Sequence, residues 1–175
     1  MEPPAPVAGN TGVTTSTEGL AELYSASYPR LVGVLALAAG SRPEAEEVVQ
    51  EAFVRLLKAW PAVSAYDDPE AWVRKVSFRL LSNRLRTARN GIRAVVRLGG
   101  PPPAPAPTGD RVDTARALAT LPVGQRQVVV LHHLVGLSVD EVAAELGIAG
   151  GTVKSRLSRA RAALDPLLRE EARHA

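Results

Sequence analysis

The sequence contains no cysteine among its 175 residues. This absence excludes disulfide bonds, thiolate metal sites and cysteine nucleophiles, and it is typical of a protein that works in a reducing compartment. The three histidines, His132, His133 and His174, lack the spacing of metal ligands. The sequence also shows no acid cluster with metal-ligand spacing and no histidine paired with a nucleophile. It therefore predicts no metal, no cofactor and no catalytic residue.

The chain also lacks a long hydrophobic run. Its longest apolar stretch, residues 31–39, covers about half of the roughly 20 residues that a membrane-spanning helix needs. The N-terminal residues contain neither the basic segment nor the apolar segment of a secretory signal. These features predict a cytoplasmic protein without membrane insertion.

Aromatic residues are scarce, at 4% of the chain, and no segment shows the alternating pattern of a strand. Apolar residues instead recur at helical spacing, with helix start and stop residues beside them. The sequence therefore predicts an all-α fold.

A proline- and glycine-rich segment interrupts the helical pattern. Five prolines lie within residues 101–107, and proline cannot continue a helix but favours an extended spacer. We therefore expect two small helical domains joined by a Pro-rich linker. The predicted boundaries are a disordered tail over 1–16, a first domain over 17–90, a linker over 91–112 and a second domain over 113–175. Within the second domain, one helix is expected over residues 122–136.

Capping residues mark where the helices of the first domain begin. Ser41 and Asp68 each precede a first turn that contains proline, so we expect a helix after each of them. Pro29 is expected to bend the helix that comes before Ser41. In the helix after Ser41, the apolar positions that face the core are expected to include Leu56 and Leu57.

Charge is unevenly distributed along the first domain. Residues 18–51 hold six glutamates and two arginines, whereas residues 72–97 hold eight lysines or arginines and no acid. At about 100° per residue, Lys75, Arg79 and Arg86 line up on the side of their helix opposite its apolar face. The first domain is therefore predicted to have an acidic side and a basic side.

Residues 138–164 have the length of a helix-turn-helix and carry its helix start and stop residues. Ser138 and Glu141 form a capping-box pair, and Gly147 ends the first helix. In the second helix, the side away from the apolar face carries small hydroxyls and cations: Thr152, Lys154, Ser155, Ser158, Arg159 and Arg161, while the cation of Arg156 is expected nearer the packing edge. Such a surface suits a helix in the major groove of DNA, with hydroxyls near base edges and cations at phosphates.

Other interpretations stay open at this point. A basic helix can be merely a solvated face, or it can lie on a membrane surface, although this one lacks the Trp and Phe residues of membrane-surface helices. For the whole protein, the alternatives are a stand-alone helix-turn-helix regulator and an enzyme that acts on nucleic acid. The regulator is disfavoured because the first domain has a basic stripe where a dimerisation domain needs an exposed apolar seam.

Three segments, in this order, resemble bacterial RNA polymerase sigma factors of the extracytoplasmic-function (ECF) group. Residues 45–60 are similar to the region 2 helix that docks on core RNA polymerase, and residues 70–86 to the helix that binds the minus-ten element. Residues 137–164 are similar to the region 4 reader of the minus-thirty-five element. The likeness covers most of residues 18–168. It implies a non-enzymatic transcription initiation factor whose partners are core RNA polymerase, promoter DNA and an anti-sigma factor.

The resemblance also implies roles for individual residues. The polymerase-binding residues would be Glu47, Gln50 and Glu51, for which an acidic first turn that complements the helix dipole is the alternative. The minus-ten residues would be Lys75, Arg79, Asn83, Arg84 and Arg86 of the basic helix, with Ser64, Ala65, Tyr66 and Asp67 of the preceding loop. On the basic helix Trp72 is expected in the core, whereas Phe78 borders the basic stripe and could face either the core or DNA.

The chain departs from the family pattern at two places. Arg79 stands where the family commonly has Asn, which adds a phosphate-binding charge and leaves the base preference open. Ala149 and Gly150 replace the usual Ser and acidic or proline residue, which removes an N-cap worth about 1 kcal/mol. We therefore expect the second helix of the helix-turn-helix to fray at its start.

Overall fold

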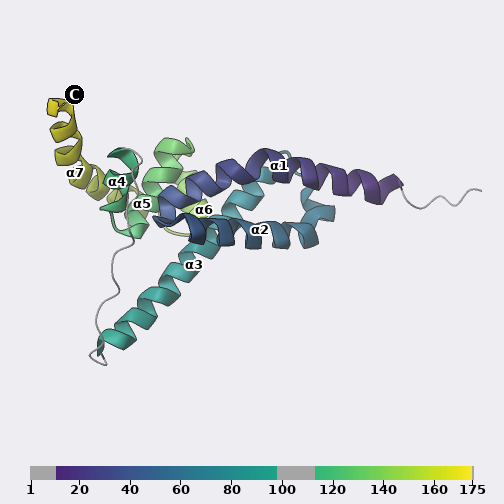
Figure 1. Ribbon diagram of the computed structural model, residues 1–175, viewed down its shortest axis with the longest axis horizontal. Helices are drawn as coiled ribbons and strands as arrows, with labels where there is room; N and C mark the ends of the chain where they lie inside the picture. Colours follow the sequence, from purple (N-terminus) through teal and green to yellow (C-terminus); the bar gives the residue numbers. More distant parts are fainter. Residues whose placement is uncertain (1–10, 98–112, 175) are drawn as a thin grey trace, which may run out of the picture.

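A computed structural model describes residues 11–97 and 113–174, with side chains for 18–87 and 114–166. The elements, in chain order, are α1 (Thr11–Ala39), α2 (Arg42–Val63), α3 (Pro69–Arg97), α4 (Asp113–Ala119), α5 (Val123–Val129), the π-helix η1 (Val130–Leu134), α6 (Val139–Leu146) and α7 (Gly150–His174) (Figure 1). No strand occurs in these ranges. The predicted all-α fold is confirmed.

Three helices begin where the capping signals place them. Ser41 Oγ accepts a hydrogen bond from Glu44 N at 3.4 Å at the start of α2. Asp68 Oδ1 accepts one from Ala71 N at 2.9 Å at the start of α3. At the start of α6, Ser138 Oγ accepts a hydrogen bond from Glu141 N at 3.2 Å, and Ser138 N donates one to Glu141 Oε2 at 2.7 Å, which completes the capping box. These side chains satisfy backbone N–H groups that have no partner within the helix.

The first and third helices are longer than the sequence predicts. α1 begins at Thr11, inside the segment expected as a tail, and it is continuous through Pro29. α3 extends to Arg97, into the segment expected as linker, and it passes through Gly91. One glycine within a helix costs only about 1 kcal/mol relative to alanine, and a helix that is already formed elongates readily. The prolines of the predicted linker and residues 1–10 lie outside the described residues.

The helix expected over residues 122–136 is two elements. After α5 the backbone widens to a π-helix, with Val135 N donating to Val130 O at 3.0 Å. The segment ends at Gly136, whose φ of 85° is in the left-handed region that glycine adopts without strain. His132 and His133 lie within this π-helix, and the centroids of their rings are 4.7 Å apart.

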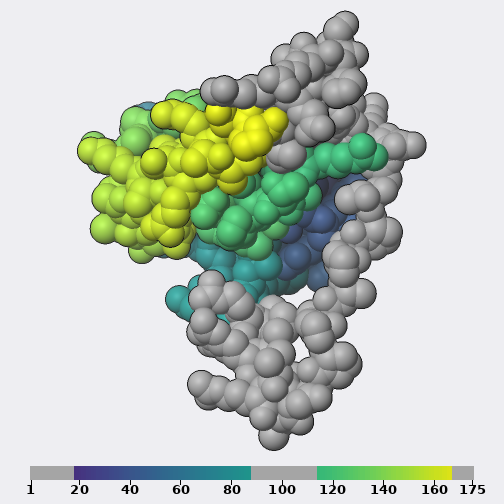
Figure 2. Space-filling view, turned by 90° about the vertical axis from the view of Figure 1, so that its left-hand side faces the viewer, coloured from purple at the N-terminus to yellow at the C-terminus, as the bar shows by residue number. Residues whose placement is uncertain are grey.

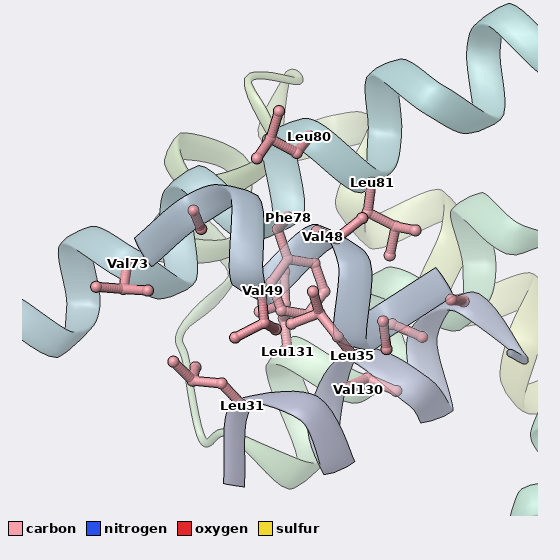
Figure 3. Packing of buried hydrophobic residues seen from close by; sticks show 14 of the residues in the cluster. Leu31, Leu35, Val48, Val49, Val73, Phe78, Leu80, Leu81, Val130 and Leu131 are labelled. Carbon is pink, nitrogen blue, oxygen red and sulfur yellow. The ribbon is translucent and has the colours of Figure 1, made fainter. Parts of the chain in front are cut away.

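The buried apolar residues of both halves of the chain form one cluster. Val130 and Leu131 of η1 are fully buried, and Figure 3 shows them beside Leu35 of α1 and Phe78 of α3. Figure 2 shows the same arrangement from outside, with the green helices of the second half lying against the first half and the yellow helix α7 lying on the green helices. Phe78 therefore belongs to the core and does not face DNA.

Candidate nucleic-acid interface

One side of α3 presents exposed polar and basic groups. Arg79, Asn83 and Arg86 are exposed, and Lys75 is half-buried. Arg86 Nη2 donates a hydrogen bond to Asn83 Oδ1 at 2.9 Å, so the amide and the guanidinium are held together one turn apart. The structure thus brings together four of the five minus-ten residues predicted on this helix.

Arg84, the fifth of these residues, points to α2. Its Nη1 lies 3.0 Å from Glu47 Oε2, and its Nη2 lies 2.9 Å from Glu51 Oε2. Arg84 therefore joins α3 to two residues predicted to bind polymerase. Arg55 also pairs with Glu51, at 2.7 Å. Spacing along a single helix could not predict this pairing, because it depends on how α2 and α3 pack.

These ion pairs change the pKa of both partners. The hydrogen bond from Arg84 is the main cause that lowers the pKa of Glu51 below its ordinary value of 4.5, and the nearby charge of Arg55 adds to it. The same contact with Glu51 raises the pKa of Arg84. Both groups are therefore charged at neutral pH, and the tie between α2 and α3 is an ion pair.

Acid is expected to weaken the tie between Arg84 and Glu51. The lowered pKa of Glu51 means that the ion pair contributes its full stability above pH 4.5, and loses it as the pH falls through that lowered value. The free energy of unfolding of Arg84→Gln is expected to lie below that of the native protein by less than about 1 kcal/mol, because the paired groups are partly exposed. This difference should shrink in acid. Urea unfolding at about pH 7 and pH 3.5 measures it. A difference that is unchanged in acid contradicts this account.

The exposed face of α2 contains apolar residues as well as acids. Leu57, predicted to face the core, has 61% of its surface exposed, and Val54 has 56% exposed. Leu57 is exposed because the buried ridge runs through Phe53, Leu56 and Trp60, and Leu57 falls beside it. Together with exposed Glu47 and Gln50, Val54 and Leu57 form a mixed surface that sequence reasoning missed. The sequence signal for this surface is the three-residue spacing of Val54 and Leu57, which places both side chains on the same face of the helix as Gln50.

The predicted loop residues Ser64, Ala65, Tyr66 and Asp67 connect α2 to α3, and all four are exposed. Tyr66 has 53% of its surface exposed, and its backbone N donates to Val63 O at 3.0 Å. The backbone of this turn is therefore fixed while the phenol ring stays accessible.

Helices α6 and α7 have the geometry of a helix-turn-helix. Gly147 ends α6 with a φ of 65°, and Ile148 N donates to Ala143 O at 3.0 Å. At the start of α7, Thr152 N and Val153 N both donate to Ala149 O. A Cβ atom built on Gly150 would lie 3.7 Å from Asp140 Oδ1, so an acid lies beside the first turn of α7. An acid in this place interacts favourably with the helix dipole.

The two faces of α7 differ as the spacing predicts. Val153 and Ala160 are fully buried. On the opposite side Lys154, Ser158, Arg159 and Arg161 are exposed, and Thr152 and Ser155 are half-buried.

Two arginines of α7 make different contacts. Arg159 Nη2 donates to Ser155 Oγ at 3.2 Å, which orients both side chains on the exposed face. Arg156 instead packs over α5, where a Cβ atom built on Gly124 would lie 3.1 Å from Arg156 Cζ. Of the predicted DNA-binding residues of α7, Arg156 is thus the one turned toward the protein.

The described residues contain no group of three His, Cys, Asp or Glu side chains that could hold a metal ion. Among them there is also no helix with the length and hydropathy needed to cross a bilayer.

Two family models match this chain. The model described as Sigma-70 region 2 matches residues 23–91, and the one described as Sigma-70, region 4 matches residues 111–164. These segments contain the basic face of α3 and most of α7, respectively.

Individual proteins agree with the family models. The ECF RNA polymerase sigma factor SigL of Mycobacterium tuberculosis is 36% identical over 141 residues, which cover 75% of this chain and 78% of the relative. The probable RNA polymerase sigma-C factor of Mycobacterium bovis is 31% identical over 128 residues, covering 69% and 68%. The solved structure of the sigma factor RpoE with the anti-sigma factor NepR from Bartonella quintana has a TM-score of 0.60 and 27% identity, covering 87% and 98%. A stand-alone regulator is therefore not favoured, and the chain belongs to the ECF sigma factors, which direct promoter-specific transcription initiation with core RNA polymerase.

Proposed function

We propose that three separate surfaces divide the work of initiation in this protein. The exposed basic side of α3, with the loop of Tyr66, binds the minus-ten element. The exposed face of α7 reads the minus-thirty-five element, and the mixed face of α2 docks on core polymerase. The observation that carries the proposal is that α3 and α7 each expose a row of cations, on helices separated by about 50 residues of chain.

The face of α7 supports base reading because it combines small and charged groups. The half-buried Ser155 and exposed Ser158 bring hydroxyls close to base edges without steric obstruction. Lys154 and Arg161 on the flanks reach phosphates, which position the helix without reading sequence. Ser155 orients Arg159 on the exposed face, and this supports the proposed contact of its guanidinium with a base edge.

The face of α3 supports binding of a strand that has left the duplex. A surface of cations that follows the backbone, next to an accessible ring, is what single-stranded DNA needs. Arg79, Asn83 and Arg86 supply polar and charged groups along the helix, and Tyr66 supplies a ring on which a base can stack. Phe78 contributes rigidity from the core.

The face of α2 supports a protein contact. Val54 and Leu57 provide an exposed apolar centre, and Glu47 and Gln50 provide a polar rim on the same helix. An apolar centre with polar edges is the usual composition of a protein–protein interface. Because Arg84 holds Glu47 and Glu51 in place, its role on α3 is to link the polymerase-binding and DNA-binding surfaces.

The remaining parts of the proposal follow from the family. Sigma factors are non-enzymatic, and we expect this chain to make and break no bonds, since polymerase supplies the chemistry. RpoE, a structural neighbour, is solved with an anti-sigma factor, and an anti-sigma factor is proposed as a partner here too. A protein that works on promoter DNA with polymerase is expected in the cytoplasm.

Two alanine substitutions on α7 should separate base reading from phosphate binding. Arg159→Ala is expected to change the preference among minus-thirty-five sequences, by about 1–3 kcal/mol at one position. Lys154→Ala should weaken binding to all sequences alike and lower the salt slope by about one. Transcription by the protein with core polymerase, on a library of upstream sequences and at several salt concentrations, measures both.

Arg30→Ala, which removes an exposed cation from α1, is a suitable control for the charge change and should leave upstream preference unaltered. If Arg159→Ala and Lys154→Ala weaken all sequences equally, the division of roles on α7 is wrong. If the wild-type protein supports no promoter-dependent transcription with core polymerase, the proposed function itself fails.

A further inference from the structure

A groove opens where α3, α5, the turn between α6 and α7, and α7 itself meet. Its volume is about 500 Å³, which lies within the range of small-molecule sites in proteins. The apolar residues that line the groove are Leu85, Val123, Leu146 and Ile148, and each of them is half-buried. The groove therefore keeps aliphatic surface, contributed by several elements, that remains for a ligand to cover.

The charges in the lining of this groove are of one sign. Arg86 of α3 and Arg156 of α7 line it, and the described lining residues include no acid. Arg86 donates to the neutral amide of Asn83, and within the described ranges neither arginine is paired with an acid. By contrast, Arg74 of α3 is neutralised by Glu145 of α6, with Nε and Oε1 3.0 Å apart. The groove thus has two positive charges and no counter-ion in its described lining.

The guanidinium of Arg156 is held in place against the backbone of α5. A Cβ atom built on Gly124 would lie 3.1 Å from Arg156 Cζ and 3.2 Å from its Nη1, closer than nearly all Cβ contacts in proteins. The planar guanidinium therefore fills space that glycine leaves free, and Arg156 is half-buried there. Because the cation is already held, less conformational entropy is lost when an anion binds to it.

The composition of the lining selects among classes of anion. The described lining residues include no aromatic side chain, on which a nucleobase would stack. Aliphatic side chains instead favour a hydrocarbon chain, because the free energy of its transfer from water grows with the apolar area that is covered. A guanidinium binds a carboxylate or a phosphate through two parallel hydrogen bonds. The groove therefore suits a small molecule with an aliphatic chain and an anionic head.

We propose that this groove is a binding site for a small amphipathic anion, an aliphatic chain that ends in a carboxylate or a phosphate. The chain lies against Leu85 and Ile148, and the anionic head lies at the guanidiniums of Arg86 and Arg156. The site goes beyond the proposed function, which requires no small molecule. Its one link to that function rests on the proposed minus-ten role of Arg86, because a bound anion offsets the charge that Arg86 offers to DNA.

Calorimetric titration of the full chain with decanoate and with decyl phosphate, at low salt, tests the proposal. At least one of them should bind with a Kd of about 1 mM or lower, the range expected for a ligand of this size. Decanol, which lacks the charge, and acetate, which lacks the chain, should each bind at least about tenfold more weakly, because each loses one of the two contributions. The tighter of the two anions identifies the head that the site prefers.

Substitution of the two arginines should weaken this binding. Arg86→Gln and Arg156→Gln are each expected to lower the affinity for the tighter anion by about tenfold, because each removes a hydrogen bond between charged groups. Arg42→Gln, which removes an exposed arginine from α2, is the matched control and should bind like the wild type. Circular dichroism checks that each variant keeps its helices.

Backbone amide shifts of the ¹⁵N-labelled protein locate the ligand. The amides of Gly124 and Gly147, which line the groove, should shift as the anion binds. The amide of Gly19, which lies beside Trp60, should keep its position. Shifts at Gly19 without shifts at Gly124 and Gly147 would place the ligand elsewhere and overturn the proposal.

The proposal is also overturned if neither anion binds, if decanol and acetate bind as tightly as the anions, or if Arg42→Gln weakens binding as much as Arg86→Gln and Arg156→Gln. Competition with a labelled oligo(dT) strand distinguishes this failure from failure of the proposed function. An anion that occupies the groove without weakening strand binding leaves the site in place and contradicts the minus-ten role of Arg86. Strand binding that depends on Arg86, in a protein that binds neither anion, leaves the minus-ten role in place and contradicts the site.

Discussion

Replacing Lys75 and Arg79 together by alanine is expected to reduce promoter opening at physiological salt by at least about tenfold. Each cation that pairs with a phosphate of a single strand contributes about 0.7 to the slope of log affinity against log salt, so the double variant should lower this slope by about 1.4. The effect is large because both side chains lie on the face of α3 proposed to hold the melted strand. Permanganate reactivity of unpaired thymines, with core polymerase across a range of salt concentrations, measures it.

Arg30→Ala with Arg42→Ala provides the matched control. Both arginines are exposed, one in α1 and one in α2, and each is paired with a nearby acid, Glu70 and Glu46 respectively. This pair removes the same net charge from the protein, yet opening and its salt slope should stay near those of the wild type. If the two double variants lose opening equally, net charge matters and the placement of cations on α3 does not.

Phe78→Ala is expected to lower the free energy of unfolding by about 3–5 kcal/mol, the usual cost of removing a buried aromatic ring. Phe78 is fully buried, beside Leu131 of η1 and within the cluster shared by both halves. Phe78→Leu should cost less, because leucine fills part of the space. Tyr66→Ala, at an exposed position, should change stability by no more than about 0.5 kcal/mol. Urea unfolding followed by circular dichroism measures all three.

The same variants distinguish a core ring from a DNA-stacking ring. Tyr66→Ala should weaken binding to promoter DNA at constant stability, because the proposed stacking contact is lost. A Phe78→Ala protein that keeps its stability but loses DNA binding contradicts the assignment of Phe78 to the core.

The sequence predicted local features well because their causes are local. Ser41, Asp68 and Ser138 cap helices through backbone groups three residues away, and such contacts depend little on the rest of the fold. The alternation of buried and exposed residues along α7 follows from helical geometry alone. The same reasoning placed Arg156 near the packing edge, where the structure has it over Gly124.

Features that depend on packing between distant segments could not be predicted in this way. The pairing of Arg84 with Glu47 and Glu51 requires the angle between α2 and α3, which no spacing within either helix encodes. The contact of Arg74 with Glu145 joins residues 71 positions apart. The sequence pattern assigns Leu57 to the core because periodicity alone does not show how wide the buried ridge of a helix is.

The most direct test of the account attaches a DNA-cleaving iron chelate to single cysteines at two exposed positions, Thr87→Cys on α3 and Ala162→Cys on α7. The chain has no cysteine of its own, so each probe reports one surface. With core polymerase on a promoter, the account predicts two cleavage clusters about two turns of DNA apart, or roughly 70 Å, the downstream one from α3 and the upstream one from α7. Cleavage by both probes at one place, or by neither, would contradict it.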